Sequence, residues 1–320
     1  MVGCGRVKNV CVGSNGEISN PHLISNEFQL GAKGVLVISS FWGRDFSVMF
    51  RDTCLPSLVR SGVFLPSFKL PIQFVVKCPR EDWFYISDAV TKIVQNCGAT
   101  IQWIEWTADS YSSDVLKNKK LIFDFITTQV KVSDSKSYVV VFAFPDHVFG
   151  RGLNKVVLSM DRGDLVVCAQ ARVTQSSINK IRETIDIDDY SNEDLVSQAV
   201  IKNPHPILTE AFSQSNSYMR LVRKSNQFGL YFKEPPPLAV FGGSQFFEKF
   251  TNSNQAKLEL IDHEIPNLFF LNESLRVVES SKIFFWMELT PDDKYKKMIQ
   301  NSFWSECAIY LNQFEVNWYL

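Results

Sequence analysis

The sequence lacks long apolar runs and an excess of charge of either sign. No window approaches the roughly 20 apolar residues that a membrane-spanning helix needs, and the strongest run, Tyr138 to Phe144, has the length of a single strand. Lys and Arg number 33 and Asp and Glu number 34, for a formal net charge of −1. Proteins that bind duplex nucleic acid are usually strongly basic, so nucleic acid is not expected as a partner.

Cysteine is sparse and follows no recognisable pattern. The chain has 7 Cys, an odd number, and no CxxC pair. This spacing argues against a disulfide framework and against a zinc site. The N-terminus also lacks the basic region and the apolar region of a signal peptide. We therefore expect a cytoplasmic protein whose thiols are all free.

The common phosphate-binding and hydrolase motifs are missing. The sequence contains no GxxxxGK[ST], no GxGxxG after the first predicted strand and no GxSxG, and none of its 4 His residues has HExxH spacing. Each of these motifs provides a geometry that its chemistry requires, such as a backbone cradle for phosphate or an exposed nucleophile. A P-loop kinase, a Rossmann dehydrogenase and an α/β-hydrolase are therefore not supported.

The chain instead contains a regular alternation of predicted strands and helices. Apolar residues make up 45% and Phe numbers 26, which is enough for a large core. Short β-branched runs predict strands over 34–40, 72–77, 101–106, 138–144 and 165–171, and the segments between them predict helices over 44–59, 81–96, 114–128 and 153–159. This alternation predicts an α/β fold with a doubly wound, mainly parallel sheet and helices on both faces. We expect 35–40, 72–77 and 138–144 to be adjacent parallel strands.

The two ends of the chain show a different pattern. Residues 1–26 are rich in Gly, Asn and Ser and predict an irregular lead-in, ahead of an α/β half over 27–174. Residues 175–320 predict a mixed α+β half of the same domain. It contains helices over 177–184 and 192–202, a hairpin of 218–223 with 229–233, apolar segments over 238–241 and 256–261, and a strand-like run over 283–289. Ser191 to Asp194 has the pattern of a capping box.

Ligands of doubly wound sheets bind outside the carboxyl ends of the strands. Candidate residues at those ends are Ser39, Phe41, Trp42, Arg44, Lys77, Arg80 and Asp146, with Arg151 and Arg172 as further cations. The aromatic rings could stack on a nucleotide base, the basic side chains could meet an anionic diphosphate, and the Asp146 carboxylate could hold a divalent cation. The competing roles are core packing for the rings, solvation for the cations and a turn cap for Asp146.

Further candidates lie in the C-terminal half. Glu210, which follows His205 closely, could act as a general base for an acceptor hydroxyl or could occupy the first turn of a helix. Asp262 and His263 follow a short apolar run. They could ligate a metal or position a sugar hydroxyl, or they could form an exposed polar turn.

Several short segments follow the strand over 34–40 in a fixed order. They are Phe41-Trp42-Gly43-Arg44, Leu55-Pro56-Ser57-Leu58, Phe144-Pro145-Asp146-His147-Val148, Gly152-Leu153, Asn203-Pro204-His205-Pro206, Ile261-Asp262-His263-Glu264 and Arg276-Val277-Val278-Glu279-Ser280-Ser281. This order resembles a group of GT-A-like glycosyltransferase domains found in bacterial and viral polysaccharide loci. The resemblance spans roughly Val35 to Asp293.

The resemblance implies a glycosyltransferase that moves a sugar from a nucleotide-sugar donor to a glycan or lipid-linked acceptor. It makes 27–174 the nucleotide-sugar-binding half and 175–320 the acceptor side. Asp146 then takes the diphosphate or metal position, with His263 as a further metal ligand and Mg²⁺ or Mn²⁺ as the cation. His205, Asp262 and His263 lie towards the acceptor, and Glu210 or Asp262 is the candidate base.

One departure from the group leaves alternatives open. Asp146-His147-Val148 stands where such enzymes usually carry DxD. This favours a second interpretation, a catalytically silent scaffold or interaction protein with the same fold. A nucleotidyltransferase is a third interpretation, but it usually needs a Gly-rich basic loop after the first strand, and Phe41-Trp42-Gly43-Arg44 fits that poorly.

Overall fold

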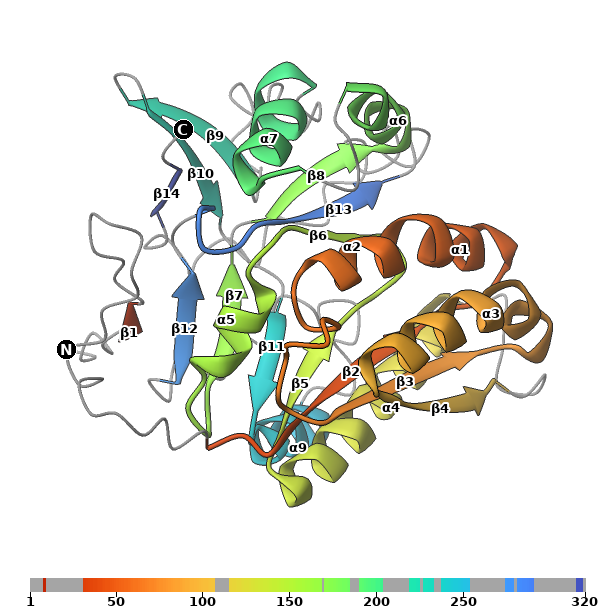
Figure 1. Cartoon of the computed structure of the whole chain (residues 1–320). Helices are drawn as coiled ribbons and strands as arrows, with labels where there is room; N and C mark the ends of the chain where they lie inside the picture. The colour runs from red at the N-terminus through yellow and green to blue at the C-terminus, as the bar shows by residue number, and fades with distance from the viewer. Residues whose placement is uncertain are drawn as a thin grey trace.

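A main sheet of eight strands runs through the molecule in the order β1-β12-β7-β11-β5-β2-β3-β4 (Figure 1). The computed structural model describes residues 8–9, 31–106, 115–168, 170–184, 190–203, 219–224, 227–232, 237–253, 274–278, 281–290 and 315–318. The strands of the main sheet are β1 (Lys8–Asn9), β2 (Gly34–Ser40), β3 (Ile72–Cys78), β4 (Thr100–Glu105), β5 (Tyr138–Phe142), β7 (Leu165–Cys168), β11 (Pro237–Phe241) and β12 (Leu275–Val278). Neighbouring strands are parallel except at β11, which is antiparallel to both β5 and β7.

The predicted arrangement of the first strands is confirmed. β2 lies between β3 and β5 and is parallel to both, with Val35 opposite Ile72 on one side and Val139 on the other. All seven residues of β2 are buried. A strand that is buried on both faces must be apolar along its whole length, which is why this segment reads as a continuous β-branched run.

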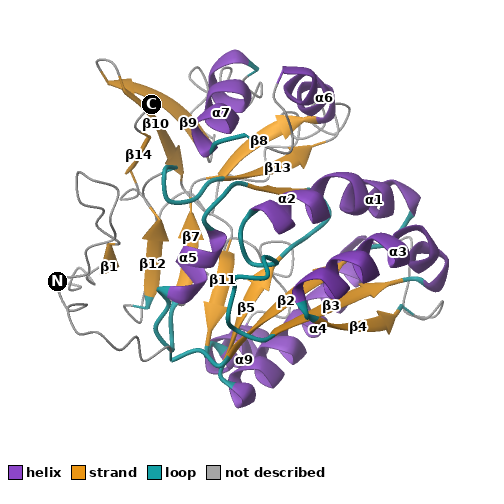
Figure 2. Ribbon diagram, in the orientation of Figure 1, coloured by secondary structure: helices purple, strands orange, loops and turns teal. Residues whose placement is uncertain are grey.

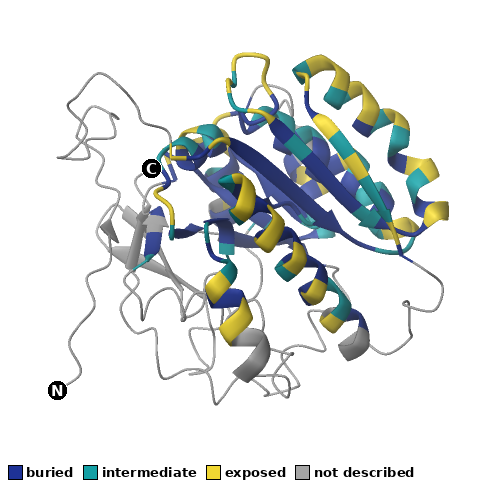
Figure 3. Cartoon of the chain, turned by 90° about the horizontal axis from the view of Figure 1, so that it is seen from below, coloured by how far each residue is buried: buried dark blue, intermediate teal, exposed yellow. Residues whose placement is uncertain are grey.

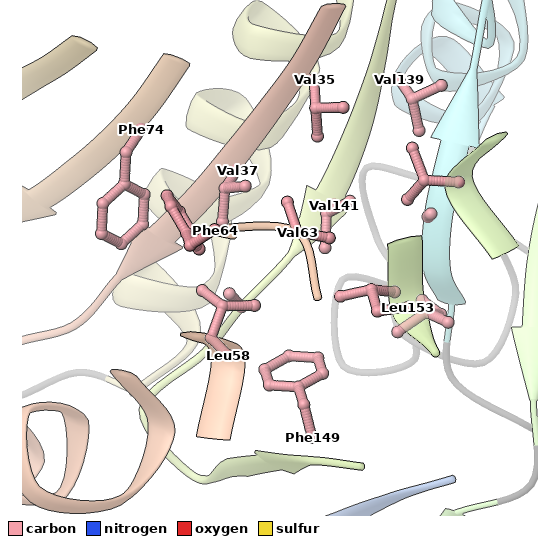
Figure 4. Packing of buried hydrophobic residues seen from close by; sticks show 14 of the residues in the cluster. Val35, Val37, Leu58, Val63, Phe64, Phe74, Val139, Val141, Phe149 and Leu153 are labelled. Atoms are coloured by element: carbon pink, nitrogen blue, oxygen red, sulfur yellow. The ribbon is translucent and has the colours of Figure 1, made fainter. Parts of the chain in front are cut away.

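Helices cover both faces of the sheet, as the sequence predicts (Figure 2). On one face lie α1 (Arg44–Met49), α2 (Leu55–Arg60), α3 (Arg80–Cys97) and α5 (Leu153–Leu158). Val35 and Val37 of β2 point to this face and pack with Phe74, Leu58 and Leu153 (Figure 4).

The opposite face of the sheet is covered by α4 (Val115–Lys136) and α9 (Ser244–Ser253). Side chains alternate along a strand, so Leu36 and Ile38 point to this face. They belong to a core cluster that includes Phe123 of α4 and Phe247 of α9, whose rings stack at 6.2 Å. Figure 3 shows the buried sheet between helices whose outer surfaces are exposed.

Two small sheets extend the main one. The first has the order β6-β13-β8 and consists of β6 (His147–Phe149), β8 (Gln170–Thr174) and β13 (Trp286–Thr290). The second has the order β14-β10-β9 and consists of β9 (Met219–Lys224), β10 (Gln227–Phe232) and β14 (Glu315–Trp318), which confirms the predicted hairpin. Two further helices in the described part of the chain are α6 (Gln175–Thr184) and α7 (Asn192–Val196).

Four predicted elements differ from the structure. The prediction of a single strand over 165–171 is wrong, because this segment is divided between β7 and β8. β7 pairs with β11 and β12 in the main sheet, whereas β8 pairs with β13 in another sheet. The helix over 44–59 is divided by a π-helical segment, Phe50–Cys54, and the helix over 192–202 ends in a second one, Ser197–Lys202. The run over 283–289 forms a strand only from Trp286. Residues 256–261 lie outside the described part of the chain.

The main sheet draws strands from both sides of residue 174. β11 and β12 come from the C-terminal half, and β12 also pairs with β1, the described strand within 1–26. Among the described residues no helix is both long and apolar enough to span a membrane. Four cysteines are described, Cys54, Cys78, Cys97 and Cys168, and all four are free.

The predicted capping box is present at the start of α7. The Ser191 hydroxyl accepts a hydrogen bond from the Asp194 amide at 3.1 Å, and Asp194 Oδ2 accepts one from the Ser191 amide at 2.9 Å. The Ser191 side chain, and then its backbone, lower the pKa of Asp194.

Ser191→Ala should lower the free energy of unfolding by about 1 kcal/mol, because it removes the cap acceptor. A lowered carboxyl pKa stabilises the fold above the unfolded value of about 3.9 and loses this effect as the pH falls further. The deficit of the variant, measured by urea unfolding, should therefore be full at pH 7 and smaller near pH 3. An equal deficit at both pH values would contradict this.

Candidate functional site

The carboxyl ends of four parallel strands, β5, β2, β3 and β4, lie side by side at one edge of the main sheet. Most of the predicted candidates that are described follow or end β5, β2 and β3, whereas Arg151 follows β6 and Arg172 lies in β8. Ser39, Phe41, Trp42 and Arg44 come with β2, Lys77 and Arg80 with β3, and Asp146 with β5. The fold therefore gathers them at a single edge, where this class of sheet binds its ligands.

The two aromatic candidates have different environments. Phe41 is buried, and its ring centroid lies 4.9 Å from that of Phe50, so it packs in the core. Trp42 is partly exposed, and its ring lies 5.5 Å from that of Trp106. The Trp106 indole N–H donates to the Lys77 carbonyl at 3.0 Å, which fixes this ring at the end of β3. Sequence reasoning placed Trp106 at the end of a strand and missed its position in the site.

The turn after β2 is held by a residue that the sequence did not identify. Gly43 has a φ of 90°, a left-handed conformation that favours glycine, and its amide donates to Asp82 Oδ2 at 2.6 Å. Asp82 lies in the first turn of α3 and is buried. In the sequence it resembles an ordinary acidic residue at a helix start. Its long-range partner emerges only from the fold.

Asp82→Ala should destabilise the protein by about 2 kcal/mol, because hydrogen bonds to charged groups are worth about 1.5–3 kcal/mol. The loss would leave the Gly43 amide without its acceptor and loosen the turn that carries Trp42. Urea unfolding measures the effect. Asp88→Ala, at an exposed position of the same helix, is the matched control and should change stability little. An equal loss in both variants would show that the Gly43 contact contributes nothing.

Basic side chains at the edge differ in burial. Arg44 is exposed, with its guanidinium 5.5 Å from the Tyr85 ring centroid, and Arg80 is exposed at the start of α3. Lys77 is half-buried, with Nζ 4.8 Å from the Trp106 ring centroid and 5.3 Å from that of Phe125. Burial lowers the pKa of Lys77, and Asp124 opposes this effect.

Two serine hydroxyls end β2. Ser39 and Ser40 are buried, and neither Oγ has a hydrogen-bond partner in the described part of the chain. Because side chains alternate, Ser39 points to the face of α1–α3 and Ser40 to the face of α4. A buried hydroxyl without a partner is uncommon in native proteins and marks a position to explain.

Asp146 lies in the turn that joins β5 to β6. Its carbonyl accepts a hydrogen bond from the Leu289 amide at 2.7 Å, which ties this turn to β13. Its side chain is 31% exposed, and Oδ1 lies 3.8 Å from His147 Nε2. The carboxylate therefore reaches the surface at the carboxyl end of β5.

The neighbours of Asp146 have structural roles. His147 is buried, its Nδ1 accepts a hydrogen bond from the Phe144 amide at 3.4 Å, and its ring lies edge-on to Trp286 at 4.3 Å. Val148, at the second Asp position of a DxD pattern, is buried in the core. Mg²⁺ is often held by one or two carboxylates together with substrate phosphates, so the Asp146 carboxylate fits a cation shared with a diphosphate.

Arg172 has a partner that the sequence did not reveal. Its guanidinium donates to both carboxylate oxygens of Glu288, at 2.9 and 3.3 Å. Across the small sheet Glu288 stands opposite His147 on one side and Arg172 on the other. This ion pair lies one residue from the Leu289 amide that holds Asp146.

The predicted acceptor-side residues, His205, Glu210, Asp262 and His263, lie outside the described residues. Within the described ranges no group of three or more His, Cys, Asp or Glu side chains could hold a metal ion.

No protein-family model and no curated protein matches the chain. Among solved structures, the bifunctional glycosyltransferase WbbM aligns with a TM-score of 0.38 and 12% sequence identity. The alignment covers 77% of this chain and 39% of the WbbM chain. The 4-diphosphocytidyl-2C-methyl-D-erythritolsynthase of Anaerococcus prevotii aligns with a TM-score of 0.37 and 13% sequence identity. This alignment covers 87% of this chain and 100% of the synthase chain. The chain thus spans well under half of the WbbM structure, and these similarities carry no argument about function.

Proposed function

We propose that this protein is a glycosyltransferase that passes a sugar from a nucleotide-sugar donor to a glycan or lipid-linked acceptor. One observation carries the proposal. Four parallel strands bring a partly exposed tryptophan, Trp42, a half-buried cation, Lys77, and a surface carboxylate, Asp146, to the same edge. A nucleotide-sugar presents a flat base and an anionic diphosphate, and these groups match a ring and a cation.

The residues have distinct roles in this proposal. Trp42, supported by Trp106, offers a face on which the donor base stacks. Lys77 and the exposed Arg44 and Arg80 offset the charge of the diphosphate. Asp146 would hold a divalent cation together with the diphosphate, and such a cation, when bound, stabilises the negative charge of the leaving group.

The acceptor hydroxyl needs a base. Asp262 and Glu210 are proposed for this role, His205 is proposed as a further catalytic residue for the acceptor, and His263 is proposed as a second metal ligand. In an inverting reaction the base takes the hydroxyl proton as the oxygen attacks the sugar.

A catalytically silent protein of the same fold is the second candidate, and Val148 favours it. Val148 has a hydrocarbon side chain without a donor atom and packs in the core, so the site has one carboxylate where a DxD pattern supplies two. A silent protein would retain the sheet and its aromatic edge without turning over a donor.

A panel of nucleotide-sugars tests the proposal. Binding is measured by isothermal titration calorimetry with and without Mg²⁺ or Mn²⁺, and donor hydrolysis is followed by release of the nucleoside diphosphate. Binding and turnover of at least one donor are expected. Binding without turnover of any donor, with a glycan acceptor present, would favour the silent protein, and no binding at all would overturn the proposed function.

A further inference from the structure

Ser40 and Lys77 lie side by side at the ends of β2 and β3. The two residues are direct partners in the parallel register. Partners in parallel strands project to the same face of a sheet, and Lys77 contacts Phe125 of α4. Both side chains therefore lie on the α4 face, at the edge where the candidate site is formed.

The ammonium group of Lys77 lies among aromatic rings. Two other described lysines bind an acidic or polar side chain: Lys131 binds Glu248 at 2.8 Å, and Lys136 binds Gln73 at 3.3 Å. Lys77 instead has aromatic rings of Trp106 and Phe125 around Nζ. In the described part of the chain no oxygen accepts a hydrogen bond from this ammonium. Aromatic rings attract a cation but do not accept its three N–H bonds as oxygens do.

The hydroxyl of Ser40 has the same deficit. Ser40 is 4% exposed, and its Oγ has no hydrogen-bond partner within the described ranges. Buried hydroxyls normally donate to a protein group or to ordered water, because an unpaired polar group costs free energy. An ammonium and a hydroxyl that are adjacent, and that both lack a protein acceptor among the described residues, share one chemical need.

That need is an oxygen acceptor that carries negative charge. A neutral carbonyl could accept the hydrogen bonds, but it would add no negative charge beside this half-buried ammonium, where burial outweighs the attraction of Asp124. Phosphate and carboxylate oxygens do both, and hydrogen bonds between an ammonium and such oxygens are among the strongest in proteins.

We propose that Lys77 and Ser40 form an anion subsite that binds a phosphate or carboxylate oxygen of the donor. This proposal rests on the proposed function and deepens it, because it identifies a group by which the donor is held. Ser40 is more deeply buried than Lys77. In this proposal the anion therefore contacts the lysine ammonium first, and it accepts a hydrogen bond from the Ser40 hydroxyl once the flexible lysine side chain has moved aside. Asp146 follows β5, on the other side of β2 from Lys77. A bound donor therefore spans β2 between the two groups.

Competitive acetylation of the intact protein tests the contact directly. Acetylation of each lysine is followed by mass spectrometry, with inorganic pyrophosphate as the phosphate probe and glucuronate as the carboxylate probe. At a probe concentration about ten times Kd, mass action predicts acetylation of Lys77 about tenfold slower. Lys92, exposed on α3, is the internal reference and should keep its rate. Protection by pyrophosphate alone assigns the subsite to phosphate, and protection by glucuronate alone assigns it to a sugar carboxylate. No protection by either probe overturns the subsite.

Two variants separate binding from packing. Lys77→Met keeps most of the length and the apolar stem of the side chain but removes the charge. It should abolish calorimetric binding of the protecting probe without lowering Tm, since it also removes a half-buried charge. Ser40→Ala should weaken that binding without lowering Tm. Lys92→Met makes the same change of net charge at an exposed position and should change neither. A lowered Tm with unchanged probe binding in Lys77→Met would assign the lysine a packing role and overturn the subsite.

The failure of this subsite differs from the failure of the proposed function. A nucleotide-sugar that binds wild type and Lys77→Met equally well overturns the subsite and leaves the glycosyltransferase standing. Protection of Lys77 by pyrophosphate, with no nucleotide-sugar bound in the calorimetric panel, supports the subsite and overturns the glycosyltransferase.

Discussion

Asp146→Asn should lower donor turnover by about a hundredfold or more while Tm stays nearly constant. An amide of the same size is a weaker ligand than a carboxylate for a hard cation, and loss of a metal clamp costs several kcal/mol in the transition state. The fold should tolerate the change because the side chain is 31% exposed. The backbone contact from Leu289 to the Asp146 carbonyl does not depend on the side chain.

Turnover assays and thermal melting on the same preparation measure both quantities. Asp88→Asn, at an exposed position on α3, removes the same charge and should leave turnover unchanged. If Asp146 only caps its turn, the pattern reverses, with stability lower by about 1 kcal/mol and turnover intact. That reversed pattern would remove Asp146 from the proposed site.

Arg276→Met should lower the free energy of unfolding by about 3–5 kcal/mol, because it leaves a buried charge without its partner. Arg276 of β12 and Asp164, just before β7, are both buried, with Nη1 2.9 Å from Oδ2. The same nitrogen donates to the Ser159 carbonyl. The pair therefore joins β12 to the segment between α5 and β7. Arg276 belongs to one of the segments that carry the family resemblance. In the structure its guanidinium binds Asp164 and the Ser159 carbonyl.

The pH dependence of this variant follows from Asp164. Burial raises the pKa of Asp164, and Arg276 is the largest opposing influence. A carboxyl group with a raised pKa destabilises the fold once the pH rises above its unfolded value of about 3.9. Without Arg276 the pKa rises further, so the loss in the variant should be larger at pH 7 than at pH 5.

Urea unfolding at the two pH values checks this expectation. The double variant Arg276→Met/Asp164→Asn is the control, because it removes both charges and keeps an acceptor for the Asp161 amide, which donates to Asp164 at 2.8 Å. It should recover much of the stability lost in the single variant. A double variant as unstable as the single one would show that the unpaired charge is not the cause.

Local patterns were sufficient to predict the elements of the α/β half. β2 is a continuous β-branched run because it is buried on both faces, and the Ser191 capping box uses residues only three apart. The division of 165–171 between two sheets could not be predicted in this way. It depends on partners far along the chain, β11 and β12 for β7 and β13 for β8. Strand propensity does not encode the choice of partner.

The same distinction holds for the candidate site. Residues that follow strands directly, such as Lys77 and Asp146, could be placed at the edge because parallel strands end together. The contacts of Asp82 with Gly43 and of Trp106 with Trp42 could not be predicted, because they depend on how α3 and β4 pack. The bidentate pair of Arg172 and Glu288 joins residues 116 positions apart. No local pattern predicts such a contact.

The position of β11 has a consequence for how the chain is made. β11 separates β5 from β7 in the sheet, although it follows both in the sequence. On the ribosome, β5 and β7 therefore emerge with unpaired edges and keep them until residues 237–241 have been synthesised. Unpaired edges recruit strands from other chains, and chains emerge at about 5–20 residues per second. The nascent α/β half thus spends seconds in a state prone to aggregation. The gap between β5 and β7 is filled only when β11 has been synthesised and pairs with both strands.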